Sequence, residues 1–133
     1  VLVWFQRALP ATIFFVPFGV MAIIGLGFAL GLTLVPVGAL YQDVGRAITT
    51  IVGFWMFLTP VIYPPPTTWP AELVNWINPV SPLLLVTRDW LLSGETAGLP
   101  GFFLVSVGTM IVLFFSLLAF RISMPIMIER MSA

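Results

Sequence analysis

Three long stretches of this chain carry no charged residue, and they limit its folding more than any other feature. The uncharged stretches are residues 8–42, 47–71 and 96–120. A membrane-spanning helix needs about 20 mostly apolar residues, so each stretch is long enough. Only 8% of the residues are charged and 60% are hydrophobic, whereas ordinary soluble domains are about 25% charged. The sequence therefore predicts an all-α protein, a polytopic transmembrane helical bundle.

Prolines and polar residues trim these stretches to three expected spans. The first covers about residues 11–35, where Pro36 is expected to end the helix and Pro17 to kink it. The second covers about residues 44–62 and the third about residues 99–120. The chain does not begin with methionine. We therefore expect one transmembrane domain over residues 1–133 that is a fragment of a longer protein, with residues 1–6 as the tail of an earlier span.

The segment between the second and third expected spans, residues 63–98, differs in kind. It opens with three consecutive prolines, and its apolar runs are too short to cross a bilayer. We expect two short helices, at residues 71–77 and 82–92, that lie at one face of the membrane or dip into it. Tryptophan is enriched at membrane interfaces, and three of the five tryptophans fall here: Trp69, Trp76 and Trp90.

The arginines give an orientation. Three spans place Arg46, Arg121 and Arg130 on one side, and Arg7 and Arg88 on the other. Since loops rich in basic residues stay in the cytoplasm, the first side is expected to be cytoplasmic and residues 63–98 external. The formal net charge is zero, so the basic surface that nucleic-acid binding requires is missing.

No catalytic, cofactor-binding or metal-ligating set is expected. The chain has no Cys, His or Lys, which removes thiolate and imidazole chemistry, zinc ligation and a P-loop lysine. The glycines at 25, 27 and 31 are spaced wrongly for a dinucleotide fingerprint. We interpret Gly27-xxx-Gly31 instead as a small-xxx-small pattern for close helix packing.

Three polar or aromatic features each leave two interpretations open. Residues 41–46 form either a solvated loop or a handle for a cytoplasmic partner; Asp43 and Arg46, three apart, would share a helix face. Trp55 lies in mid-span, where its indole N–H needs a partner, so it either packs against a carbonyl or faces a conduit. Arg88-Asp89 is either an ordinary interfacial ion pair or a buried functional pair.

The order of four short motifs resembles a known family. The motifs are Tyr41-Gln42-Asp43-Val44, Thr59-Pro60-Val61-Ile62-Tyr63-Pro64, Asn78-Pro79 and Thr87-Arg88-Asp89-Trp90-Leu91-Leu92-Ser93-Gly94, followed by a last span with a short basic tail. This order is similar to the C-terminal half of the permease subunit of polysaccharide and polyol-phosphate ATP-binding-cassette exporters. Members export O-antigen, capsular polysaccharide or teichoic acid.

The resemblance implies an architecture and a set of site residues. The three expected spans would be the last three of six, in a homodimer that docks two cytoplasmic ATPase subunits. Gln42 stands where many members carry an arginine, and Arg46 is the nearest arginine that could supply the charge. The implied ATPase-coupling residues are Tyr41, Asp43 and Arg46; the channel-lining residues are Phe54, Trp55 and Tyr63; the external gate residues are Asn78, Pro79, Arg88 and Asp89.

The resemblance also implies a function. The chain would be a multi-pass protein of the bacterial inner (plasma) membrane that moves a glycan or polyol-phosphate polymer, free or lipid-linked, out of the cell. ATP would be hydrolysed on the separate partner, and the chain itself would be neither an enzyme nor a cofactor carrier. Two alternatives remain: a drug or lipid exporter of the same superfamily, and a membrane enzyme acting on lipid-linked sugars. The enzyme is disfavoured because the acidic residues are spread over both faces.

Overall fold

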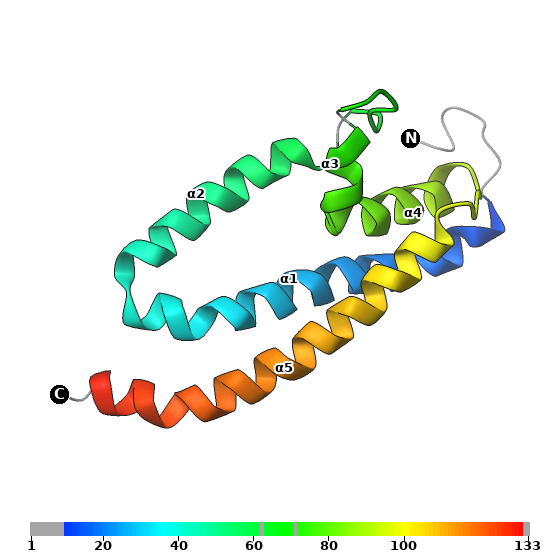
Figure 1. The fold of residues 1–133 in the computed structure, drawn as a ribbon. Helices are drawn as coiled ribbons and strands as arrows, with labels where there is room; N and C mark the ends of the chain where they lie inside the picture. The colour runs from blue at the N-terminus through cyan, green and yellow to red at the C-terminus, as the bar shows by residue number, and fades with distance from the viewer. Residues whose placement is uncertain (1–9, 62, 71, 132–133) are drawn as a thin grey trace.

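Every regular element in the described part of the chain is a helix, as the sequence predicts. The computed structural model describes residues 10–61, 63–70 and 72–131; the expected tail of an earlier span, residues 1–6, lies outside them. The elements follow one another in the order shown in Figure 1: a 3-10 turn, η1 (Ala11–Phe15), and then α1 (Val16–Leu40), α2 (Gln42–Leu58), α3 (Glu72–Ile77), α4 (Val80–Leu92) and α5 (Leu99–Met131).

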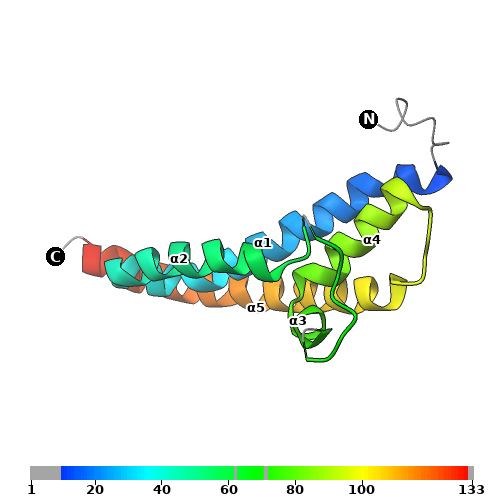
Figure 2. The same ribbon diagram turned by 90° about the horizontal axis from the view of Figure 1, so that it is seen from above.

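The two longest helices, α1 and α5, lie side by side in the half of the molecule that holds the α1–α2 turn, and they diverge toward the other end, where α4 lies between them (Figures 1 and 2). Two helical segments are long and apolar enough to cross a membrane: Ala11–Ala39, which joins η1 to α1, and Leu99–Pro125 of α5. A helix in the core of a soluble protein buries most of its residues, but only 17% of each apolar window is buried inside this chain. The remaining apolar surface is available to lipid or to other protein segments.

The first expected span differs from the observed helix at both of its prolines. Pro36 does not end the helix, which continues to Leu40. A proline inside a helix removes one backbone hydrogen bond, a loss that membrane helices tolerate where neighbouring groups compensate. Pro17 produces no internal kink, because it lies in the first turn of α1, where its missing N–H costs nothing. The connection to α2 is consequently one extended residue, Tyr41, at φ −132° and ψ 104°.

The other two expected spans also have different ends. The α2 helix stops at Leu58 and not near residue 62, because Thr59 precedes a proline and is extended, at φ −93° and ψ 129°. Seventeen residues make α2 about 26 Å long at 1.5 Å per residue, slightly shorter than the roughly 30 Å hydrocarbon layer. The α5 helix continues beyond Arg121 to Met131.

Both expected short helices are present, as α3 and α4, and α4 supplies the centre of the core. Its buried residues pack with α1 and α5 in one cluster, made of Leu26, Leu83, Val86, Trp90 and Phe102. The Trp90 and Phe102 rings are 5.1 Å apart, centroid to centroid. Trp90 is therefore a core residue and not the interface anchor that its type predicted, whereas Trp69 and Trp76 are each 79% exposed.

The α4 helix runs back along the first half of α1. Thr12 Oγ1 donates to the Trp90 carbonyl at 2.9 Å, and Gly19 faces Thr87 so closely that a Cβ at Gly19 would overlap the threonine side chain. The helix ends where Gly94 adopts φ +77°, a left-handed conformation that glycine takes without strain. Since α4 begins beside the middle of α1, the α3–α4 turn lies at mid-length of the long helices (Figure 1).

Within the described chain, glycine permits a close helix contact at Gly19 and at Gly98, where a Cβ would overlap Val86, and not at the predicted Gly27-xxx-Gly31. A Cβ at Gly27 or Gly31 would have no atom within 4 Å among its neighbours in the chain. Farther along, α1 and α5 are joined by hydroxyls: Thr33 Oγ1 and Ser116 Oγ are 2.6 Å apart. Neither hydroxyl was singled out by sequence analysis, although both are isolated polar groups in apolar spans, which is the available signal.

We predict that Gly19→Ala destabilises the protein by about 1–3 kcal/mol, the usual cost of overpacking a close contact. Gly27→Ala is the matched control, since its new methyl group meets open space. Thermal unfolding of both variants in the same detergent measures the difference. Equal midpoints for the two variants would show that α1 and α4 do not pack as closely as the structure has them.

Candidate functional site

A buried asparagine, Asn78, joins three helices at the α3–α4 turn. Its side chain is 3% exposed. The Nδ2 group donates to Thr59 Oγ1 at 2.8 Å and, over a longer 3.5 Å, to the Leu58 carbonyl. The Oδ1 atom accepts from Trp55 Nε1 and from the Val80 backbone N–H, both at 3.0 Å. One carboxamide therefore contacts the end of α2 and the first amide of α4.

The local sequence explains why the chain turns here. Asn78 precedes Pro79, and a residue before proline avoids the helical conformation. The Asn78 backbone N–H closes the end of α3 on the Val74 carbonyl at 3.0 Å. Its side chain then bonds the N–H two residues ahead, the Asx turn for which asparagine is favoured, and so satisfies a free amide at the start of α4. The same residue ends one helix and starts the next.

This carboxamide has no unused hydrogen-bonding group. An asparagine side chain offers two N–H donors and one oxygen with two lone pairs, and all four have a partner at Asn78. Because an unpaired buried polar group costs about 1–3 kcal/mol, the four bonds together favour a single arrangement of α2 relative to α4. We call Trp55, Thr59 and Asn78 the junction triad.

The expected channel-lining residues fall at or beside this triad. The partner that the Trp55 indole N–H requires is a carbonyl oxygen, that of the Asn78 side chain, which agrees with the packing interpretation for this group; 39% of Trp55 remains exposed. Phe54 is 69% exposed. Tyr63 donates from its hydroxyl to the Phe57 carbonyl at 2.9 Å, which folds the segment after α2 back onto its last turn.

Arg88 and Asp89 are half-buried on α4, but an ion pair does not tie them together in the described structure. Neighbouring residues on a helix point in different directions, so adjacent charges do not face each other. Burial raises the pKa of Asp89, Arg88 opposes that rise, and Glu95 adds to it. The surroundings of Asp89 therefore disfavour its carboxylate form, contrary to the ion-pair interpretation of Arg88-Asp89.

The expected coupling residues lie far from the triad. Tyr41, Asp43 and Arg46 are all exposed, and the α1–α2 turn lies at the same end of the molecule as the C-terminal end of α5 (Figure 1). Asp43 in the first turn of α2 and Arg46 just after it belong to this helix and not to a loop. The negative charge of Asp43 is favourably placed at a helix N-terminus.

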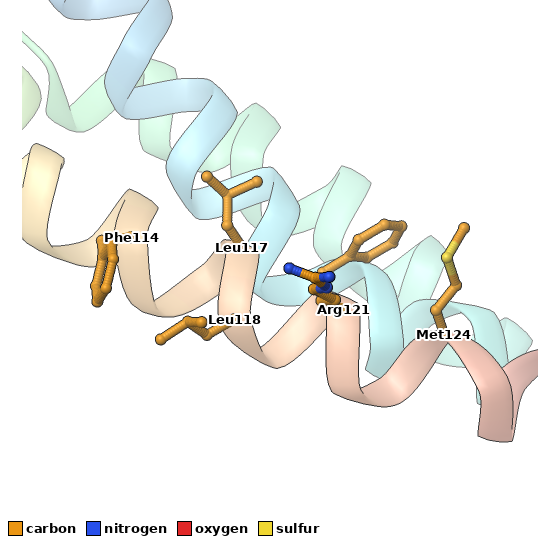
Figure 3. Close-up of a pocket in the computed structure, with 6 residues that line it drawn as sticks. Phe114, Leu117, Leu118, Arg121 and Met124 are labelled. Carbon is orange, nitrogen blue, oxygen red and sulfur yellow. The ribbon is translucent and has the colours of Figure 1, made fainter.

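Two other features of the described residues, a surface hollow and the acidic side chains, do not form a second site. A shallow hollow on the outside of α5 is lined by side chains of that one helix, so it encloses nothing (Figure 3): Phe114, Leu117, Leu118, Phe120, Arg121 and Met124. Within the same described residues, no three Asp, Glu, His or Cys residues gather in a group that could hold a metal ion.

Comparisons of the chain with protein-family models, with curated proteins and with solved structures found no match.

We predict that Trp55→Phe destabilises the protein by about 0.5–1.5 kcal/mol, because it keeps an aromatic side chain and removes the hydrogen bond to Asn78. Trp76→Phe is the matched control: its indole N–H bonds Glu72 Oε1 at 3.3 Å on an exposed surface, and its loss should cost little. Chemical denaturation in detergent measures both. An effect at Trp76 as large as that at Trp55 would contradict the assignment.

We predict that Asp89→Asn stabilises the protein at neutral pH and has no such effect below pH 3.8, the ordinary pKa of aspartate. Because burial raises the pKa of Asp89, the folded protein holds this proton more tightly than the unfolded chain. The stability from the neutral acid is complete at low pH and is lost as the pH rises through the folded-state pKa. Unfolding midpoints across this range test the sign, and a destabilised variant at neutral pH would show that the carboxylate is paired.

Proposed function

We propose that this chain belongs to the membrane-spanning permease subunit of an ATP-driven exporter, which moves a polysaccharide or polyol-phosphate polymer out across the bacterial inner membrane. The subunit acts as a homodimer with a cytoplasmic ATP-binding-cassette ATPase. Tyr41, Asp43 and Arg46 contact the ATPase, and α3 and α4 form the external gate. In this proposal α2 and the segment that follows it complete a third crossing between those of α1 and α5.

One observation carries the proposal: a single helix, α2, connects the exposed polar turn at Tyr41 with the buried triad at Asn78. An exporter powered from the cytoplasm needs a rigid element that reaches from the ATPase contact to the gate. A helix that begins with exposed charges and ends in a buried hydrogen-bond network has this form.

The exposed aromatic side chains beside the triad support a polymer as the cargo. Phe54, Trp69 and Trp76 are each more than two-thirds exposed, and all three lie on α2 or on the segment that leads through α3. Aromatic faces are apolar platforms that also tolerate hydroxyl groups, which suits sugar and polyol chains. Because these surfaces carry little charge, the contacts we propose are with the sugar or polyol units of the polymer and not with its phosphates.

We predict that the double variant Asp43→Ala with Arg46→Ala loses co-purification with the ATPase and lowers polymer export, while its membrane level stays normal. These two side chains are exposed and serve no interior contact, so their loss should not unfold the protein. Pull-down of a P-loop ATPase encoded beside the permease, together with surface staining of the polymer, measures both effects.

Glu95→Ala is the control, because it removes an exposed charge at the other end of the molecule. An ATPase that binds the double variant as well as the wild type would contradict the contact. A cysteine at Arg46 that reacts with a membrane-impermeant reagent added outside the cell would show that the orientation is inverted.

A further inference from the structure

The α2 helix touches the rest of the described chain only near its two ends. Its one substantial helix contact is with α1, to which the single residue Tyr41 joins it. Over its second half, no other described element covers this helix: Ile51, Val52, Phe54, Met56, Phe57 and Leu58 are each 48% exposed or more. At its far end exposure stops abruptly, since Thr59 is 3% exposed and Pro60 is fully buried.

We infer that the Asn78 carboxamide is a latch that fixes the far end of α2 to the start of α4, and that α2 swings about Tyr41 when the latch opens. Tyr41 suits a hinge because it is the single extended residue between two helices. The latch suits release because it consists of hydrogen bonds and not of an extensive apolar contact. Among the described residues, opening it exposes few buried apolar side chains besides Pro60, so this part of the chain opposes the motion with little hydrophobic free energy.

The two sides of the carboxamide have different tasks. Nδ2 holds α2 through Thr59 and Leu58, whereas Oδ1 bonds both Trp55 of α2 and the first amide of α4. A displacement of α2 therefore pulls on the group that caps α4, and α4 is the element packed between α1 and α5. Under the proposed function, on which this direction of transmission rests, a force applied near Tyr41 would reach the gate through this one side chain.

A distance measurement tests the latch. Spin labels are placed on cysteines at Met56 of α2 and Leu104 of α5, which are 57% and 75% exposed, in the full-length protein on a cysteine-free background. The labelled protein is diluted with unlabelled copies so that only distances within one chain are recorded, and it is reconstituted in lipid nanodiscs. The wild type should give one narrow distribution.

Asn78→Ala should broaden this distribution or add a second, longer population. Thr59→Val should have the same effect more weakly, because it only replaces one hydroxyl by a methyl group of nearly equal volume. Asn75→Ala is the matched control: Asn75 is an asparagine of α3 whose Nδ2 bonds the Pro66 carbonyl at 3.3 Å and not α2. An unchanged distribution in Asn78→Ala, or an equal change in Asn75→Ala, overturns the latch. If the Asn78→Ala protein does not insert into the membrane, the distance distributions of Thr59→Val and Trp55→Phe test the latch. If both of these are unchanged, the latch is overturned.

The readout needs no ATPase and no cargo, so its failure is distinguishable from failure of the proposed function. If the latch opens in Asn78→Ala but the protein binds no ATPase, the latch inference is supported and the exporter proposal is contradicted.

Discussion

A carboxamide buried among apolar helices must satisfy two donors and two acceptor positions without help from water, and at Asn78 that requirement determines how three helices meet. Each partner comes from a different place: the last turn of α2, the extended residue after it, and the first amide of α4. Moving any one of these elements would leave a polar group unpaired, which costs more than a single hydrogen bond returns. The turn between α3 and α4 is specific for this reason, although α3 has only six residues.

Small side chains complete the assembly on the other side of α4. Gly19 lets α1 approach the Thr87 side chain, and Ala29, fully buried, lies where Ser116 of α5 reaches the α1 backbone. Between apolar helices in lipid no hydrophobic difference drives association, so close backbone approach and interhelical hydrogen bonds provide the specificity. The α1–α4–α5 cluster and the hydroxyl pair farther along α1 are thus two contacts of one packed unit. The α2 helix is not part of this unit.

The difference between this packed unit and α2 organises the proposed function. Helices that share a core move together, whereas a helix held at two points has one soft degree of freedom. Exposed charges at the Tyr41 end and a closed hydrogen-bond network at the Asn78 end give the two attachment points different chemistry. The charged Tyr41 end can exchange partners in water. The hydrogen-bond network at Asn78 can adopt few arrangements, because its surroundings are apolar.

The sequence by itself determined the all-helical fold, the two long apolar helices and the two short ones between them, because runs of apolar residues and helix-breaking prolines act locally. It also identified Trp55 and Asn78 as residues of interest and the need of the Trp55 indole for a partner, although it placed Trp55 in mid-span and the structure places it in the last turn of α2. It could not pair them, since 23 residues separate the two and many carbonyls were available. Which glycine meets a neighbour, why Trp90 is buried while Trp76 is exposed, and whether Pro36 ends a helix were decided only by the tertiary structure. Each depends on which surfaces face one another. The hydrophobicity of the sequence indicates how much apolar surface must be covered, but it does not indicate which helix covers it.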